Sequence, residues 1–187
     1  MRLIPLLGVL VAASLGTALS GGSAPLTFDP AASRVEVVVK ATVDSFTGRL
    51  EKFEPEVTLG ADGQIATARL RFRFADVKTG KEKRDRAMHE WQQTDRFPDG
   101  EFELATLTPA PDGRWLATGR LTFHGQTRPL DFPVTLKWQG PAATIDGEAQ
   151  IDTREFGLPV IRMMGLLKVD PLVLVRFHLE GKKEATP

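Results

Sequence analysis

The chain has 187 residues, and its 24 lysines and arginines are balanced by 24 acidic residues. This length suffices for one domain with its own hydrophobic core, and the even charge provides no global positive field to attract nucleic acid or an anionic membrane. Cysteine is absent, which excludes disulfides, a lipid-modified cysteine, a thiolate metal site and a cysteine nucleophile.

The first twenty residues differ from the rest of the chain. Arg2 gives a positive start, residues 3–19 are apolar and contain no acid, and Ala18-Leu19-Ser20 places small residues at the cleavage spacing. This pattern predicts a secretory signal peptide over residues 1–20 and a single domain over residues 21–187. A retained membrane anchor is the alternative. Cleavage removes Arg2 and leaves a net charge of about −1, and we expect the bacterial periplasm as the destination.

Apolar and polar residues alternate along most of the remaining chain, which is typical of half-buried strands. Turn signals such as Asp112-Gly113 separate the alternating runs. We predict about eight strands. Their inward rows are Val35, Val37 and Val39; a run over 49–59; alternate residues of 66–74; Phe102, Leu104 and Thr106; and alternate residues of 115–123, 130–138, 143–151 and 173–179.

Eight antiparallel strands joined by short turns predict an all-β, eight-stranded antiparallel barrel, with room for side chains or one small ligand. A two-sheet sandwich is the alternative. Small residues on the inward rows favour the barrel, because the volume they leave unfilled would be a destabilising cavity in a sandwich and a pocket in a barrel. These residues are Ala117, Gly119, Ala143, Gly147 and Ala149.

Residues 79–99 interrupt the alternation and predict one short helix in a long connection. Thr79 and Glu82 have the spacing of a capping box, which marks a helix start. Met88 and Trp91 would share one face of the following turns, and Phe97-Pro98 would end the segment because the residue before proline avoids helical geometry. A charged helix between strands is typical of a plug or a lid.

The sequence predicts no catalytic or metal-binding residue. His89-Glu90 resembles the start of a zinc-protease motif, but residue 93 is Gln, so the second histidine is missing. No spacing requires His89, His124 and His178 to converge on one ion. The serines lack the Gly-x-Ser-x-Gly pattern of a nucleophile elbow.

Arg69, Arg71 and Arg73 form a basic stripe on one face of a predicted strand. A surface that binds nucleic acid would interleave exposed aromatic residues with such arginines. Here Phe72 and Phe74 fall on the opposite face of the strand, so we interpret the stripe as a solvated outer surface.

Five segments of the chain, taken in order, carry a likeness to a known family. They are 28–30 with 33–37; 47–53; 79–80 with 83–85; 97–98 with Phe102; and 121–130 with 154–158. The ordered set resembles the YceI-like family of bacterial periplasmic proteins. The resemblance implies an extended, lipocalin-like eight-stranded antiparallel barrel that binds polyisoprenoid chains in an apolar interior and has no recognised enzymatic activity. The helix then belongs to the long connection of that fold.

Together, the pattern and the resemblance predict a binding protein for a long apolar lipid, such as a polyisoprenoid or an isoprenoid quinone, with no other cofactor and no metal. Arg84 and Asp85 would anchor the lid through an ion pair or backbone contacts, and Met88 and Trp91 would seal it. A filled barrel that binds a protein partner through its helix and loops is the alternative, and a homodimer is left open. The predicted wall residues are Val37, Val39, Leu70, Phe72, Phe74, Phe102, Leu121, Phe123, Phe132, Val134, Leu136, Trp138, and the adaptable Met163 and Met164.

Overall fold

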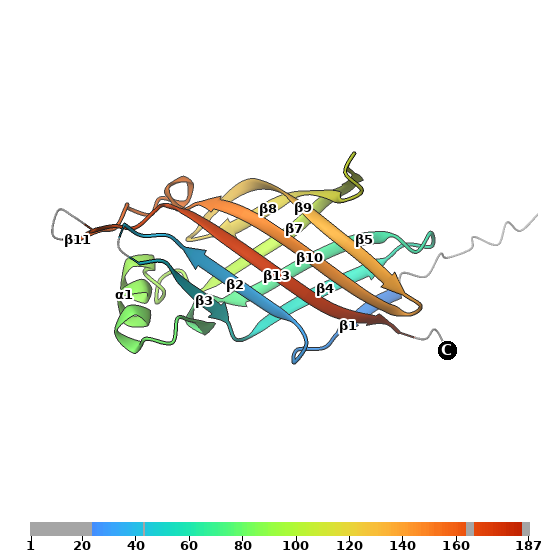
Figure 1. Cartoon of the computed structure of the whole chain (residues 1–187), viewed down its shortest axis with the longest axis horizontal. Helices are drawn as coiled ribbons and strands as arrows, with labels where there is room; N and C mark the ends of the chain where they lie inside the picture. The colour runs from blue at the N-terminus through green and yellow to red at the C-terminus, as the bar shows by residue number, and fades with distance from the viewer. Residues whose placement is uncertain (1–23, 43, 164–166, 185–187) are drawn as a thin grey trace, which may run out of the picture.

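Strands make up most of the fold. The computed structural model describes residues 24–42, 44–163 and 167–184 (Figure 1). The predicted signal peptide lies outside these residues and stays a prediction. The strands are β1 (Ala24–Phe28), β2 (Arg34–Val39), β3 (Phe46–Leu50), β4 (Phe53–Leu59), β5 (Ile65–Arg73), β6 (Val77–Lys78), β7 (Asp99–Pro109), β8 (Trp115–Phe123), β9 (Gln126–Gln139), β10 (Ala142–Asp152), β11 (Arg162–Met163), β12 (Leu167–Lys168) and β13 (Leu172–Lys183); the helices are η1 (Phe74–Asp76), α1 (Glu82–Gln92) and η2 (Thr153–Phe156).

The long strands close into an antiparallel barrel. Neighbours follow the order β1-β4-β5-β7-β8-β9-β10-β13, and β13 pairs back with β1. At one end, β2, β3 and β6 extend the sheet, because β2 pairs with β13, β3 with β2, and β6 with β3. The prediction of an all-β, eight-stranded antiparallel barrel is confirmed, with α1 as the one α-helix in the part of the chain described.

The two ends of the barrel differ. At the end that we call the α1 end, on the left of Figure 1, α1 and the segment with η2 and β11 cover the strands. The opposite end, which we call the far end, consists of tight strand connections at 60–64, 110–114 and 140–141. Buried aliphatic residues pack beneath those connections. They include Leu26, Val57, Leu59, Ile145 and Leu179.

The structure has two strand breaks that the predicted rows do not include, one between β1 and β2 and one between β3 and β4. The carboxylate of Asp29 accepts hydrogen bonds from the backbone N–H groups of Ala31 (2.8 Å) and Ala32 (3.4 Å), and the resulting turn separates β1 from β2. Strand β1 was not among the predicted rows. The predicted run over 49–59 is likewise divided into β3 and β4, and between them the N–H of Glu51 continues the pairing of β3 with β6 by donating to the carbonyl of Asp76 (2.9 Å).

A bulge in β7 changes which residues face inward. Leu104 pairs with Gly119, but the register shifts before the next pair, Thr106 with Thr118. The inward row therefore continues at Leu107, and the prediction that Thr106 follows Leu104 inward is wrong. A bulge inserts one extra residue into a strand, so period two cannot hold across it.

The helix is shorter than predicted at both ends. It begins at Glu82 with Lys81 as its N-cap and without a side-chain cap, so the capping box from Thr79 is wrong. Instead, the carboxylate of Asp85 accepts hydrogen bonds from the N–H (2.9 Å) and hydroxyl of Thr79. The helix ends at Gln92, well before Phe97-Pro98, because Gln93 adopts the left-handed conformation (φ 55°) of a helix C-terminus.

Gln92 is a fully buried polar residue that the sequence pattern does not reveal. Its amide nitrogen donates to the carbonyl oxygen of Phe97 (3.1 Å), and its amide oxygen accepts from the hydroxyl of Thr94 (2.8 Å). The side chain thus fixes the path from α1 to β7. Burial of a polar group is tolerated where such hydrogen bonds satisfy it.

We expect Gln92→Ala to lower the free energy of unfolding by about 1–3 kcal/mol, because it removes the hydrogen bonds that the buried amide makes with Phe97 and Thr94. Urea titration followed by circular dichroism measures this change. Glu90→Ala, on the exposed side of the same helix, is the matched control and should stay within about 0.5 kcal/mol of wild type. Equal effects of the two substitutions would contradict a role for the buried amide.

Candidate functional site

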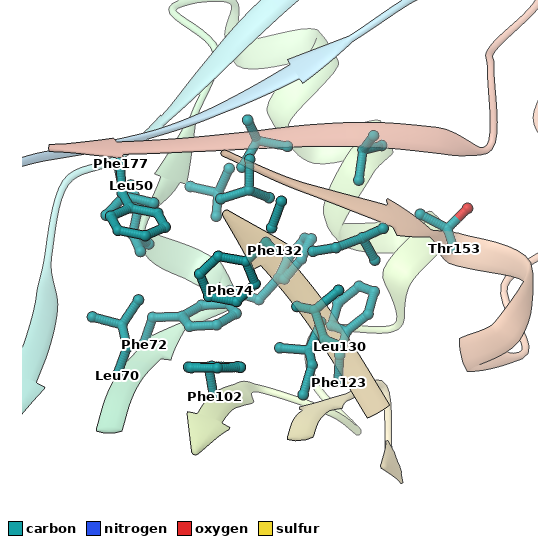
Figure 2. Close-up of a pocket in the computed structure, with 18 of the residues that line it drawn as sticks. Leu50, Leu70, Phe72, Phe74, Phe102, Phe123, Leu130, Phe132, Thr153 and Phe177 are labelled. Atoms are coloured by element: carbon teal, nitrogen blue, oxygen red, sulfur yellow. The ribbon is translucent and has the colours of Figure 1, made fainter. Parts of the chain in front are cut away.

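The interior of the barrel contains an apolar cavity of about 630 Å³ (Figure 2). The volume lies within the range of about 300–1,000 Å³ that is typical of small-molecule sites. All strands of the closed barrel except β1 contribute lining residues, as do α1 and the chain at 159–162. Valine, leucine, isoleucine and phenylalanine dominate the wall, so the cavity offers dispersion contacts along its length and few polar partners.

Most of the predicted wall residues do line the cavity. Their side chains come from β2, β5, β7, β8 and β9, and from η1, so strands distant in the sequence converge on one volume (Figure 2). Lining is a geometric finding, whereas ligand binding by these residues stays a prediction. The residues are Val37, Val39, Leu70, Phe72, Phe74, Phe102, Leu121, Phe123, Phe132, Val134 and Leu136.

Trp138 does not line the cavity. It follows Leu136 on the inward row of β9, but the strand extends beyond the enclosed interior at the far end, and 37% of Trp138 is exposed. The Lys183 ammonium lies 4.6 Å from the centre of its ring, a cation–π contact at the barrel rim. Met164 and the side chain of Met163 lie outside the described residues, so their assignment to the wall stays a prediction.

Several lining residues were not selected from the sequence. Ile145, Ile151, Val173, Val175 and Phe177 line the cavity from β10 and β13. The sequence pattern could have identified them, because they occupy predicted inward rows and every strand of a barrel contributes to its interior. Three others, Phe46, Val77 and Ile161, lie in short strands or connections, and no periodic pattern marks them.

Small inward residues do not create the free volume in the way expected. The ring of Phe102 lies over Gly119, and the ring of Phe177 lies over Gly147, so the space beside each glycine is filled. For these two glycines the prediction is wrong, whereas Ala117 and Ala149 of the same set do line the cavity. The phenyl rings of Phe102 and Phe177 line it as well (Figure 2).

Residues of α1 cover one end of the cavity. Met88 and Trp91 line it, and the indole N–H of Trp91 donates to the carbonyl of Pro159 (2.8 Å), which joins the helix to the opposite rim. Arg84 also lines the cavity, with its guanidinium carbon 4.1 Å from the centre of the Phe46 ring. These contacts place the helix where the lid was predicted.

Arg84 and Asp85 anchor this cover through Thr79. The guanidinium of Arg84 donates to the hydroxyl (2.9 Å) and the carbonyl (3.1 Å) of Thr79, whose N–H and hydroxyl donate to Asp85. Of the two anchoring modes expected, the structure therefore uses backbone and hydroxyl contacts rather than an Arg84–Asp85 ion pair. Thr79, which was assigned to a capping box, is the common partner.

The polar residues of the wall gather at the α1 end, with one exception. The exception is Arg69, whose guanidinium bonds Glu103 on the outer face (3.0 Å). The others are Arg84, Thr153, Arg162 and Asp170. A molecule with one polar terminus would therefore find polar partners at the α1 end and an apolar wall towards the far end.

The segment around η2 closes the cavity beside α1. Phe156 and Leu158 are buried against Leu121 and Phe123. His124, in the β8–β9 turn with φ 48°, donates from Nδ1 to the carbonyl of Phe156 (2.8 Å). Because a carbonyl only accepts, Nδ1 carries the proton, and His124 holds the β8–β9 turn to η2.

The histidines serve separate structures. His89 contacts Thr94 at the end of α1, His124 bonds Phe156, and His178 lies between Asp146 (2.6 Å) and Glu180 (3.1 Å) on the outer face. No group of three or more histidine, aspartate or glutamate side chains in the described ranges is arranged to hold a metal ion. Nor does any helix within those ranges have the length and apolar character needed to cross a membrane.

The arginine stripe on β5 is paired with acids on neighbouring strands. Arg69 bonds Glu103 (3.0 Å), and Arg71 bonds Glu101 (3.1 Å) and Glu56 (3.2 Å). The hydrogen bond from Arg69 holds the pKa of Glu103 below its ordinary value. Arg69 and Arg71 thus form cross-strand pairs on the outer face of the barrel, which agrees with the interpretation of the stripe as a solvated outer surface.

These features define the protein as a lipocalin-like barrel: a closed, eight-stranded antiparallel barrel with an apolar interior covered by one helix. The model of the YceI-like domain matches residues 26–181, which is most of the chain. The chain therefore belongs to the YceI-like family. No match was found among curated proteins.

Solved structures share the fold. BcnA from Burkholderia cenocepacia superposes with a TM-score of 0.73 at 24% identity, covering 86% of this chain and all (100%) of that one. A polyisoprenoid-binding domain from Saccharophagus degradans gives 0.63 at 16% identity, with 87% and 100% covered. A YceI protein from Campylobacter jejuni gives 0.57 at 13% identity, with 78% and 88% covered.

Asp152 at the start of η2 predicts a pH dependence of stability. Hydrogen bonds from the Arg154 side chain, and in addition from its N–H, lower the pKa of this carboxyl. A carboxyl with a lowered pKa in the folded state stabilises the fold above its unfolded pKa, and this contribution is lost as the pH falls through the folded value.

We expect Asp152→Asn to lower the free energy of unfolding at pH 7 and to flatten its decline below about pH 4, where an ordinary aspartate titrates. Urea unfolding at a series of pH values from 7 to 3 measures the slope. Arg154→Met should flatten it in the same way, because the guanidinium is the main cause of the shift. A slope unchanged from wild type in both variants would refute the assignment.

Proposed function

We propose that the protein binds a long apolar lipid, such as a polyisoprenoid or an isoprenoid quinone, inside the barrel and carries or stores it without a chemical step. The observation that carries this proposal is the cavity of about 630 Å³ inside the barrel with its almost wholly apolar wall. The related domain from Saccharophagus degradans is described as polyisoprenoid-binding, which supports the same class of ligand here.

Burial of apolar surface supplies the driving force. Each Å² removed from water contributes about 25 cal/mol, so a chain that buries roughly 400 Å² gains about 10 kcal/mol before ordering costs. Few directional contacts are then required. The polar residues Arg84, Thr153 and Asp170 at the α1 end suit a ligand whose head group lies there and whose chain extends towards the far end.

The site of action in this proposal is the periplasm, reached through cleavage of residues 1–20. The basic, apolar and small-residue regions of that segment support it. A cell fractionation with detection of the mature N-terminus by mass spectrometry tests this part separately. Recovery of the uncleaved chain in the membrane fraction would contradict cleavage and would indicate a retained membrane anchor.

The alternative, a filled scaffold for a protein partner, requires a packed interior. A cavity of this size favours the lipid, because an empty volume inside a scaffold lowers stability without a function to offset it. Extraction of the purified protein into organic solvent, followed by mass spectrometry, decides between them. An isoprenoid in the extract is expected; a protein that is lipid-free and takes up none when offered would overturn the proposal.

Two neighbouring residues of β13 provide a matched pair of variants. Val175 lines the cavity, whereas Leu174 lies on the other face of the strand and does not. We expect Val175→Trp to abolish uptake of an apolar fluorescent probe, since the indole would occupy the lumen. Leu174→Trp should bind the probe as wild type does. Equal binding by the two variants would place the ligand outside the barrel.

Trp91 tests the role of the helix as a cover. Trp91→Ala removes both the ring over the cavity and the hydrogen bond to Pro159, and we expect the dissociation rate of bound lipid to rise roughly tenfold, equal to about 1.4 kcal/mol. Trp91→Phe keeps most of the ring and loses only the hydrogen bond, so its effect should be smaller. Stopped-flow transfer to acceptor vesicles measures both rates, and unchanged rates would show that α1 does not retain the ligand.

A further inference from the structure

Four phenylalanines form a band around the cavity, which we call the phenylalanine collar. Phe72, Phe102, Phe132 and Phe177 come from β5, β7, β9 and β13, and all line the cavity. The ring centres of Phe102 and Phe132 are 5.1 Å apart, and those of Phe132 and Phe177 are 5.8 Å apart. Figure 2 labels all four among the side chains that line the cavity.

Two rings of the collar occupy the place of a missing β-carbon. Phe72 pairs with Gly100 on β7, and Phe177 pairs with Gly147 on β10. A β-carbon on Gly100 would lie 2.2 Å from Cζ of Phe72, and one on Gly147 would lie 2.1 Å from Cζ of Phe177. Both separations are below 3.0 Å, which real contacts of a β-carbon essentially never show.

Backbone conformation does not explain these two glycines. Neither is among the residues of positive φ, and both lie in regular ladder positions where other residues fit. In such a strand glycine lowers stability, because it contributes no side chain to the packing. The close approach of an aromatic ring from the neighbouring strand is therefore what requires glycine at Gly100 and Gly147.

The consequence concerns the width of the lumen. The Cζ end of each ring lies where a β-carbon of the glycine would stand, so the ring uses space within the wall. With a β-carbon beneath it, the ring would have to turn away from the sheet. It would turn into the cavity, because the cavity is the open space beside it. The same two phenylalanines would then narrow the passage at the collar from two sides.

We propose that Gly100 and Gly147 are specificity-determining residues, which let the rings of Phe72 and Phe177 lie against the wall and so keep the collar wide enough for a methyl-branched chain. The identity of the ligand rests on the proposed function, whereas the width of the collar is a property of the barrel alone. Narrowing rejects a branched chain before a straight one, because each methyl branch adds to the cross-section of the chain.

Gly119 is unsuited to the test although Phe102 also lies over it. A β-carbon there would come within 2.4 Å of the backbone carbonyl oxygen of Glu103, so a substitution would disturb the ladder itself. Gly181 on β13 is the better comparison. Its β-carbon would meet the ring of Phe28 at 3.1 Å, and Phe28 is not part of the cavity wall.

The experiment compares the affinities of geranylgeraniol, which is branched, and of a straight-chain fatty alcohol of similar length, by displacement of a bound fluorescent fatty acid. We expect Gly147→Ala and Gly100→Ala to weaken binding of the branched alcohol by roughly tenfold or more, as a misfit of one methyl group does, and that of the straight one by much less. Gly181→Ala should bind both as wild type does. Equal losses for the two alcohols, or none, would overturn the proposal.

A second variant separates the ring from the glycine. In Gly147→Ala/Phe177→Leu the smaller side chain no longer meets the added methyl group, so binding of the branched alcohol should return towards wild type. Should Gly147→Ala fail to fold, recovery of folding in the double variant supports the same cause. A double variant that remains unfolded, or remains selective against the branched alcohol, refutes it.

The position of the ring is measurable without any ligand. A crystal structure of Gly147→Ala should show Phe177 turned into the cavity; a ring left in place over a widened sheet would overturn the proposal. The position of the ring therefore tests the role of Gly147 whatever the ligand is. If wild type binds the straight alcohol and rejects the branched one, the proposed isoprenoid ligand is contradicted, while the role of Gly147 is not. Failure of the proposed ligand and failure of the proposed collar are thus distinguishable.

Discussion

Closure of the sheet by the pairing of β1 with β13 is the constraint on which the rest of the structure depends. Leu26 of β1 faces Val57 of β4 on one side and Lys183 of β13 on the other, so a strand of five residues joins the two edges. The turn at Asp29 then lets β2 continue along β13. Without this closure the same residues would form an open sheet with two exposed edges and a groove in place of a cavity.

Closure gives the two faces of every strand different surroundings: the outer face contacts water, and the inner face contacts the interior of the barrel. On β5, Arg69 and Arg71 pair with acids outside, while Leu70 and Phe72 line the cavity. The outer ion pairs are exposed and contribute little to stability individually. Their arrangement as complementary cross-strand pairs keeps the outer surface polar, which leaves the inner face free to be almost entirely apolar.

The two ends of the cavity are held by different kinds of interaction. The far end is closed by regular ladders and buried aliphatic side chains. The α1 end is closed by irregular segments, which are held by the buried side chains of Phe156 and Leu158 and by single hydrogen bonds such as that of Trp91 with Pro159. Irregular segments open locally more readily than regular ladders, so under the proposed function we expect the ligand to enter and leave at the α1 end.

The sequence by itself determined the features that depend on local periodicity: about eight strands, their turns, and most of the residues that line the interior, such as Leu70 and Val134. It determined too the presence of one helix with Met88 and Trp91 on its inner face. Only the tertiary structure decided the bulge after Leu104 and the placement of phenyl rings over glycines. These depend on which residue lies opposite on the neighbouring strand, and alternation within a strand carries no information about its partner.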